Sequence, residues 1–588
     1  MRSWIHSVGR WATGILLAAL LLRIALAWMS VDVLIQKTIP DDAFYYFTIA
    51  RNLVENASVS LDGATPTNGF HPLWLMMNVP IFLLTRGHYE LPIHLALTIS
   101  AILDVTTGVV IYRLVMRLTA DEAAAAVGIF AYLFNPLVIF QAVNGLETSL
   151  AVLLFALFTA HYIAMRLTRA SLKSYALQGI LGGLMLLART DNAFLLAIIF
   201  FHALAVERGK LRFIGPVMMG ALGFAMIAPW ILWSMITVGT PLQTSGVAVP
   251  YVFHQLFVDQ NGWSFAAMVA ESFQRILNVP VLLGGGEWTG LPIVVGPILW
   301  NLLGVASFLI VSKSNRATAP RWIHRLRLLA LPTASCALLM LFHTVLRWYP
   351  RPWYFVPCSL LFAMITGTVY SQLHKLSRLR RYKGLVGPIL AEIFLIFGVA
   401  GWGQGAYPWQ TEMYQGATWL AVNTPSSSRV ASFNAGIYAY FSQRSVTNLD
   451  GTVNGVAFKA IQSRNLMQYI LDDEIDFLID YEASFDMYAS FFGDPLHNHT
   501  QFVTKIDNPK VAWMDSSIQV YRVVRLPEGQ APFGGSNSAQ RQSPITPAPL
   551  AGFKEAKIAG MIFGKHEERV GTLSLEEYYR TYGQTYDQ

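Results

Sequence analysis

The sequence predicts a polytopic α-helical membrane protein with an α/β domain outside the membrane near its C-terminus. Three observations predict this fold class. Only 13% of the 588 residues are charged, about half the share found in soluble domains, and the mean hydropathy is +0.43. Apolar segments of spanning length recur through residues 1–403. Residues 404–528 change to short runs separated by turn residues, which is typical of strands.

The apolar segments predict about eleven membrane spans. The first follows Arg2 and Arg10, as in a signal peptide, but it is long enough to span and has no clear cleavage site, so we expect a retained helix. The predicted spans lie near residues 11–30, 94–112, 123–141, 147–165, 175–189, 192–206, 213–236, 290–312, 328–346, 353–372 and 384–403.

Basic loops between these segments predict the orientation. Positively charged loops favour the cytoplasm, which places the N-terminus there as well. This assignment requires that the short apolar stretch 71–85, which contains Pro80, does not cross; we expect it to be an interfacial or re-entrant helix. The basic loops contain Arg113 and Arg117, Arg166 to Lys173, Arg208 to Arg212, Lys313 to Arg327, and Lys375 to Lys383.

The orientation brings several polar stretches to the outer face of a cytoplasmic membrane. They lie around Asp41, Glu147, Arg189 to Asp191, 239–245 and Arg347 to Trp353, and everything after about residue 404 lies outside with them. The net charge of +7 comes largely from the basic loops and does not indicate nucleic-acid binding.

The outer segment is expected to form a small α/β domain. The stretch 429–451 predicts a strand, a short helix and a strand, 476–481 and 518–526 predict further strands, and 465–473 predicts a helix. We therefore divide the chain into a membrane domain at 1–403, the α/β domain at 404–528, and a partly disordered linker and tail at 529–588.

Two adjacent acids, Asp41 and Asp42, open the stretch "DDAFYYFTIARNL" directly after the first span. Acids at a helix start suit capping and the helix dipole. A carboxylate beside an apolar surface and a second acid also has a raised pKa, which suits a general base. A third interpretation is that the pair holds a divalent cation.

Further ionisable residues lie on the predicted outer face. Glu147, in "NGLETSL", is either a first-turn acid or a functional group at membrane depth. Arg189 and Asp191, in "LLARTDN", either pair with each other or leave arginine donors for a phosphate. His71, in "TNGFHPLW", either anchors a headgroup region or pairs with a phosphate.

The stretch "LRWYPRPWYFVP" combines Arg347 and Arg351 with four aromatic residues. An aromatic belt with basic flanks would explain it. Arginines on the outer face depart from the usual charge distribution, however, and a lipid-linked phosphate would hold them there. Cys336 and Cys358 lie in apolar stretches and predict no disulfide framework.

The order of these motifs resembles the GT-C class of membrane glycosyltransferases, which includes the protein O-mannosyltransferases, the lipid A aminoarabinose transferases and the mycobacterial arabinofuranosyltransferases. The likeness rests on "DDAFYYFTIARNL", the following His-Pro helix, "NGLETSL", "LLARTDN", "GTPLQTSG" and "RPWYFVP", and it covers roughly residues 1–403. The chain looks like a bacterial branch of this class. Residues 404–528 resemble outer domains of such transferases less specifically.

The resemblance implies an inverting transfer of a sugar from a polyprenyl-phosphate donor to a hydroxyl of a cell-envelope glycan, lipid or protein. One of the acid pair becomes the base, with Asp41 preferred and Asp42 left open, and Glu147 supports the base or positions the acceptor. The implied donor-phosphate residues are His71, Arg189, Arg347 and Arg351. The implied substrate-binding residues are Tyr45, Asn68, Asp191, Trp353 and Tyr354.

Two details qualify the implied site. The lipid A transferases have a lysine where this chain has His71, and an imidazole is only partly charged at neutral pH. A monophosphate leaving group with arginine partners needs no metal, so we expect no cofactor and no metal requirement, although a divalent cation at the acid pair stays open.

Two other functions remain as alternatives. A lipid-linked sugar flippase would place ionisable groups at mid-membrane and on both sides, with repeat symmetry, and the sequence shows no internal repeat. A non-catalytic scaffold would bind a partner through its outer domain and carry decayed motifs; the intact acid pair favours an enzyme instead.

Overall fold

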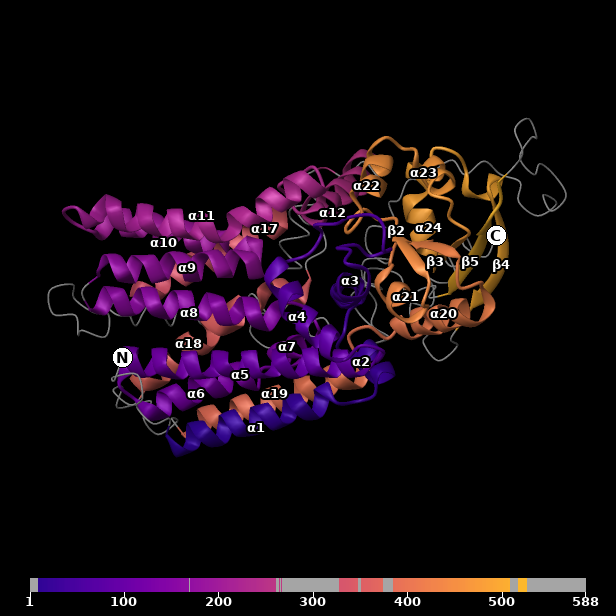
Figure 1. Cartoon of the computed structure of the whole chain (residues 1–588). Coiled ribbons are helices and arrows are strands. Elements are labelled where there is room, and N and C mark those ends of the chain that lie inside the picture. Colours follow the sequence, from indigo (N-terminus) through magenta and orange to yellow (C-terminus); the bar gives the residue numbers. More distant parts are fainter. Residues whose placement is uncertain are drawn as a thin grey trace.

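The computed structural model describes residues 9–168, 170–260, 264, 266, 327–346, 351–373, 384–507 and 517–525. Long helices run side by side in a bundle, and a sheet domain lies at one end of it, with α3 between the two (Figure 1). The predicted fold class, a polytopic helical protein with a C-terminal α/β domain, is confirmed.

The bundle is built from long apolar helices. They are α1 (Arg10–Ala27), α5 (Leu91–Thr119), α6 (Glu122–Leu133), α7 (Pro136–Ala142), α8 (Thr148–Leu167), α9 (Leu172–Ala188), α10 (Ala193–Val206), α11 (Leu211–Thr237), α17 (Ala330–Leu346), α18 (Val356–Leu373) and α19 (Val386–Gln404). In the described part, six helices are long and apolar enough to cross a membrane, or seven if the bent pair α6–α7 is one span. The predicted span at 290–312 lies outside the described residues, and the total of about eleven stays a prediction.

The predicted span at 123–141 is not a single straight helix, because the chain bends by 61° between α6 and α7. Pro136 has no N–H to continue the helix. The side chain of Asn135 accepts the N–H of Leu137 at 3.0 Å and so caps α7. The bend therefore follows from an Asn-Pro pair inside an apolar run.

A buried charge cluster supports this bend. Arg23 of α1 donates from Nη2 to the carbonyl oxygen of Leu133, at the end of α6, at 2.8 Å. Its Nε pairs with Asp104 of α5 at 2.8 Å, and Tyr132 donates to the same carboxylate at 2.8 Å. Arg23 thus satisfies a carbonyl group that the broken helix leaves without its usual partner.

Three helices connect the first span to the second. They are α2 (Val31–Lys37), α3 (Asp41–Asn56) and α4 (Pro72–Leu84), and α4 packs against α3. The predicted interfacial stretch 71–85 coincides with α4. Its 13 residues extend about 20 Å, which is short of the ~30 Å hydrocarbon core of a bilayer.

The α/β domain, which we call the outer domain after its predicted location, contains one five-stranded sheet in the order β2-β1-β3-β5-β4. Strands β1 (Arg429–Ser432), β2 (Ser445–Asn448) and β3 (Phe477–Tyr481) are parallel, whereas β5 (Ile518–Val523) is antiparallel to both β3 and β4 (Thr500–Ile506). The predicted strands and the predicted helix at 465–473 are confirmed, and β4 is an additional strand. The helices of this domain are α20 (Gln410–Asn423), α21 (Gly436–Phe441), α22 (Gly455–Gln462), α23 (Leu466–Asp472) and α24 (Glu482–Tyr488).

Candidate active site

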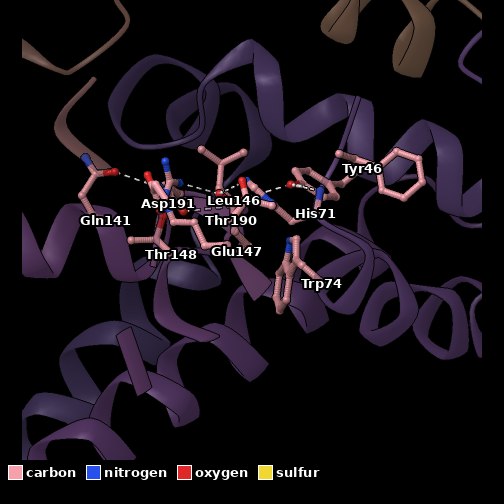
Figure 2. Close-up of polar contacts among 12 residues, drawn as sticks. Tyr46, His71, Trp74, Gln141, Leu146, Glu147, Thr148, Thr190 and Asp191 are labelled. Atoms are coloured by element: carbon pink, nitrogen blue, oxygen red, sulfur yellow. Dashed lines mark hydrogen bonds and ion pairs between the residues drawn. The ribbon is translucent and has the colours of Figure 1, made fainter. Parts of the chain in front are cut away.

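Glu147 is the centre of a buried polar network at the start of α8. Its carboxylate accepts a hydrogen bond from the Tyr46 hydroxyl at 2.9 Å and pairs with Nη1 of Arg189 at 2.7 Å. His71 lies 3.6 Å from the same carboxylate. Figure 2 shows Tyr46 and His71 on one side of Glu147 and Asp191 on the other. The network joins α3, the segment before α4, and the α8 and α9 ends.

The turn before Glu147 explains how it is positioned. Gly145 has a φ of +75°, and a Cβ there would lie 3.1 Å from Ala43 of α3, so glycine suits this close approach. The side chain of Asn144 accepts the N–H of Leu146 at 2.9 Å, and Trp74 donates to the carbonyl oxygen of Gly145 at 2.9 Å. The sequence Asn-Gly-Leu-Glu thus fixes the acid against α3 and α4.

Arg189 is held on several sides. Its Nε pairs with Asp191 at 2.9 Å, and its guanidinium lies 4.6 Å from the ring centroid of Tyr354. His343 of α17 lies 3.3 Å from Asp191 and stacks on Tyr354 with ring centroids 4.4 Å apart. Because Arg189 pairs with both Asp191 and Glu147, these contacts favour a supporting role over direct phosphate binding.

His71 and Asn68 anchor the segment before α4. Gln243 donates to the carbonyl oxygen of Phe70 at 2.6 Å and lies 3.1 Å from Nδ1 of His71. Asn68 is fully buried; its amide donates to the carbonyl oxygen of Leu242 at 2.9 Å, and its oxygen accepts the Thr244 hydroxyl at 2.6 Å. Asn68 therefore ties two loops together, and these contacts favour a structural role over the predicted substrate contact.

Asp41 binds the outer domain rather than an open site. Its carboxylate accepts the N–H groups of Gly436 at 3.1 Å and Ile437 at 2.6 Å, at the start of α21. Its own N–H donates to Gln410 of α20 at 2.7 Å. A Cβ at position 436 would lie 2.2 Å from the carbonyl oxygen of Asp41, so only glycine fits there. Burial raises the pKa of Asp41 to about 8.

Asp42 has different surroundings. It is half-buried, and burial raises its pKa above the ordinary carboxyl range. The Arg351 guanidinium acts against this shift, and the negative charge of Glu147 adds to it. We expected Asp41 to be the base in preference to Asp42. Because the outer domain encloses the Asp41 carboxylate and leaves Asp42 half-buried, Asp42 is better placed for this role.

The predicted arginine and aromatic stretch contributes Arg351, which is half-buried just before the 3-10 helix η5 (Pro352–Phe355). Its guanidinium lies 5.8 Å from the ring centroid of Trp353, which is buried. Arg347 lies outside the described residues. Of the predicted phosphate residues, Arg351 thus combines partial exposure with proximity to Asp42.

Tyr45, a predicted substrate-binding residue, contacts the outer domain. Its hydroxyl accepts the N–H of Ala435 and the amide of Asn448, each at 3.3 Å. Two residues further along, Asp450 interacts electrostatically with both Asp42 and Tyr45. Sequence reasoning treated this Asn-Leu-Asp-Gly stretch only as a turn, because nothing local shows that it lies beside α3.

Two parts of the chain match known protein families. Residues 73–233 match the family described as Dolichyl-phosphate-mannose-protein mannosyltransferase, and residues 404–524 match a domain of unknown function, DUF8728. No curated protein matches the chain.

Two solved structures show the same arrangement over most of the chain. The Archaeoglobus fulgidus oligosaccharyltransferase is 13% identical, with a TM-score of 0.55 over 85% of this chain and 74% of that one. ArnT from Cupriavidus metallidurans, bound to undecaprenyl phosphate, is 12% identical, with a TM-score of 0.52 over 87% of this chain and 98% of that one.

These likenesses show the fold. The chain is a multi-pass membrane protein with the fold of the GT-C glycosyltransferases, so the predicted resemblance is confirmed in fold. The family match over residues 73–233 indicates a glycosyltransferase.

Proposed function

We propose that this protein is an inverting glycosyltransferase that moves a sugar from a polyprenyl-phosphate donor to a hydroxyl of a cell-envelope acceptor. The observation that carries the proposal is the half-buried Asp42 carboxylate, which interacts with the Arg351 guanidinium at the junction of bundle and outer domain. One similar structure contains undecaprenyl phosphate, and another contains dolichol-phosphate with an inhibitory peptide, which supports a lipid-linked donor.

The transfer follows from the positions of these two charges. Asp42 removes the proton from the acceptor hydroxyl as its oxygen bonds to the anomeric carbon. The bond from that carbon to the phosphate oxygen breaks on the opposite face, and polyprenyl phosphate leaves with the bonding electrons. Arg351 pairs with the departing phosphate through charge-assisted hydrogen bonds.

The buried network beneath the site holds these groups in place. Glu147 connects Tyr46 of α3 to Arg189, and Arg189 packs on Tyr354 beside Arg351. The two halves of the proposed site, α3 with Asp42 and η5 with Arg351, are thus linked by paired side chains. Such support keeps reacting groups within the tolerance that group transfer requires.

The proposed location is the outer face of the cytoplasmic membrane, with the N-terminus in the cytoplasm. Glu147 precedes α8, and Arg166 lies in its last turn, about 30 Å away along a 20-residue helix. Arg166, which belongs to one of the predicted cytoplasmic loops, therefore lies at the end of α8 opposite Glu147, as the positive-inside rule favours.

The test uses purified protein with undecaprenyl-phosphate-linked mannose and arabinose, a panel of octyl glycosides as acceptors, and release of undecaprenyl phosphate as the readout. Loss of a general base lowers a rate by about 10²–10⁴-fold, so Asp42→Asn is expected to abolish most release. Asp41→Asn keeps an oxygen that can accept an N–H of α21 and is expected to retain most of it.

Two outcomes would contradict the proposal. Full release by folded Asp42→Asn would remove the base assignment, and no release by the wild type from any donor would remove the transferase function. Metal independence is a separate expectation: release should be unchanged after treatment with EDTA, and restoration by Mg²⁺ or Mn²⁺ would instead indicate a cation at the carboxylates.

A further inference from the structure

A loop of the outer domain reaches the proposed site. It follows β2 and contains residues 448–453. Asn448 donates to the Tyr45 hydroxyl of α3 at 3.3 Å, and a Cβ at Gly69 would lie 2.1 Å from the carbonyl oxygen of Thr452. The loop therefore contacts the bundle at two places, α3 and the segment before α4.

Asp450 is held at the tip of this loop by its own backbone turn. One oxygen of its carboxylate accepts both the N–H of Thr452 at 2.8 Å and the Thr452 hydroxyl at 2.7 Å. The Asp450 side chain is half-buried. The turn fixes the direction of the carboxylate, as an Asx-turn does, without enclosing it.

Burial separates the charged groups at this junction into two sets. Asp41, Glu147 and Arg189 are buried and paired within the protein, so they hold its parts together. Asp42, Arg351 and Asp450 are only partly buried, which leaves them accessible to a substrate. Burial raises the pKa of Asp450 to about 6, and the negative charge of Asp42 adds to this shift, as expected for two carboxylates near each other.

Given the proposed transferase function, on which this step rests, we infer that Asp450 is an acceptor-binding residue supplied by the outer domain. Its carboxylate accepts a hydrogen bond from a second hydroxyl of the acceptor, next to the hydroxyl that Asp42 deprotonates. Two carboxylates repel an acceptor that carries a phosphate or carboxylate near the reacting hydroxyl. The acceptor class is therefore an uncharged sugar or polyol with neighbouring hydroxyls.

The chemistry of the three accessible groups divides the site between the two substrates. The single cation, Arg351, suits the donor phosphate, whereas Asp42 and Asp450 suit hydroxyl donors. Because Asp42 belongs to the bundle and Asp450 to the outer domain, the acceptor would lie between them. This gives the outer domain a direct part in choosing the acceptor.

The test separates acceptor binding from the chemical step. Transfer to octyl glycosides and hydrolysis of the donor by water are both measured for the wild type and for Asp450→Asn. Losing a hydrogen bond between a hydroxyl and a charged group costs about 1.5–3 kcal/mol, so KM for the glycoside is expected to rise about 10- to 100-fold. The donor KM and the rate of donor hydrolysis should stay unchanged.

Matched variants distinguish binding from a structural effect. Asp472→Asn removes an exposed carboxylate elsewhere in the outer domain and should keep the wild-type KM. Asp450→Glu restores a carboxylate and should recover part of the lost affinity. An unchanged glycoside KM in Asp450→Asn, or an equal rise in Asp472→Asn, would overturn the inference while donor hydrolysis still confirms the enzyme. Absence of any donor cleavage by the wild type would instead overturn the proposed function, and the inference with it.

Discussion

Asp41 and Asp42 are adjacent in sequence, but they have opposite surroundings at the start of α3. The carboxylate of Asp41 is enclosed by two N–H groups of the outer domain, whereas that of Asp42 is half-buried beside Arg351. Neighbouring residues in the first turn of a helix point about 100° apart, so the two carboxylates reach different surroundings. One dipeptide can therefore supply both a residue that attaches the outer domain, Asp41, and the proposed base, Asp42.

The raised pKa of Asp42 predicts a pH dependence. A base must be deprotonated to act, so release of undecaprenyl phosphate should rise with pH through a pKa that lies above the ordinary carboxyl range. The rate under saturating donor and glycoside, measured from pH 4 to 7, checks this expectation. A rate that is constant over this range would contradict it.

Arg351 is expected to bind the donor phosphate and, through its charge, to oppose the raised pKa of Asp42. Arg351→Ala removes the charge that pairs with the phosphate, and KM for the donor should rise about 10- to 100-fold by loss of charged hydrogen bonds. Arg351→Lys should recover part of the affinity, because it restores the charge without the planar fork. Arg464→Ala, an exposed arginine of the outer domain, is the control and should match the wild type.

At the scale of elements, the bend between α6 and α7 depends on charges buried within the helix bundle. Arg23, Asp104 and Tyr132 come from three helices and are joined around the carbonyl oxygen of Leu133. Every charge in this cluster has a partner. The cluster is therefore a structural support for the bent helix, distinct from the ionisable groups at the proposed site.

Removing one residue of the Arg23–Asp104 pair should lower the stability of the protein more than removing both. Arg23→Met leaves the Asp104 carboxylate buried without its cation, which costs about 3–5 kcal/mol. Arg23→Met combined with Asp104→Leu should recover part of this loss. The thermal unfolding midpoint in detergent measures both variants, and a double variant less stable than the single one would contradict the expectation.

The sequence predicts helices and strands well where the hydrophobic periodicity is strong. It predicts them poorly where a contact with a residue distant in sequence determines the local structure. The long apolar helices and the strands at 429–432 and 477–481 follow from local pattern. Strand β4 is not predicted by the local pattern, because it is an edge strand with a largely exposed, mixed sequence. The Asn135-Pro136 pair favours a bend, but the apolar run around it predicts one span.

The site residues also divide into those that local sequence predicts and those whose positions depend on distant contacts. Loop parity predicts a common side for Asp42, Glu147 and Arg351, whereas the role of Asp41 depends on Gly436, which lies 395 residues further along the chain. The position of Asp450 likewise depends on how the two parts pack. Such pairings are tertiary, and a single sequence does not carry them.

At the scale of the whole molecule, the outer domain is attached to the bundle through several separate contacts. Asp41 binds the start of α21, and Arg51 donates to the carbonyl oxygens of Ala439 and Tyr440 near its end, each at 3.0 Å. Helix α12 (Thr244–His254) adds an aromatic contact between Tyr251 and Phe458. Helix α21 is thus bound at both ends by α3, the helix that carries the proposed base.

The contact of Asp41 predicts that this attachment weakens at high pH. The docked pKa of about 8 lies above the ordinary 3.8, so docking is strongest below pH 3.8 and is lost as pH rises through 8. Protection of the Gly436 and Ile437 amides against hydrogen exchange, corrected for intrinsic rates, should fall between pH 6 and 9. Asp41→Asn cannot ionise and should keep its protection, whereas Asp41→Ala should lose it at every pH.

The contact between Asp41 and Gly436 also has a consequence for biosynthesis. The ribosome makes α3 early and α21 some 380 residues later, so the partners of Asp41 do not exist while most of the helix bundle is being inserted. Until the outer domain has folded, the first turn of α3 lacks the contacts that orient it, and Asp42 with it. Under the proposed function, an incompletely synthesised chain would therefore lack a positioned base. It would not hydrolyse the lipid-linked donor before the acceptor site is complete.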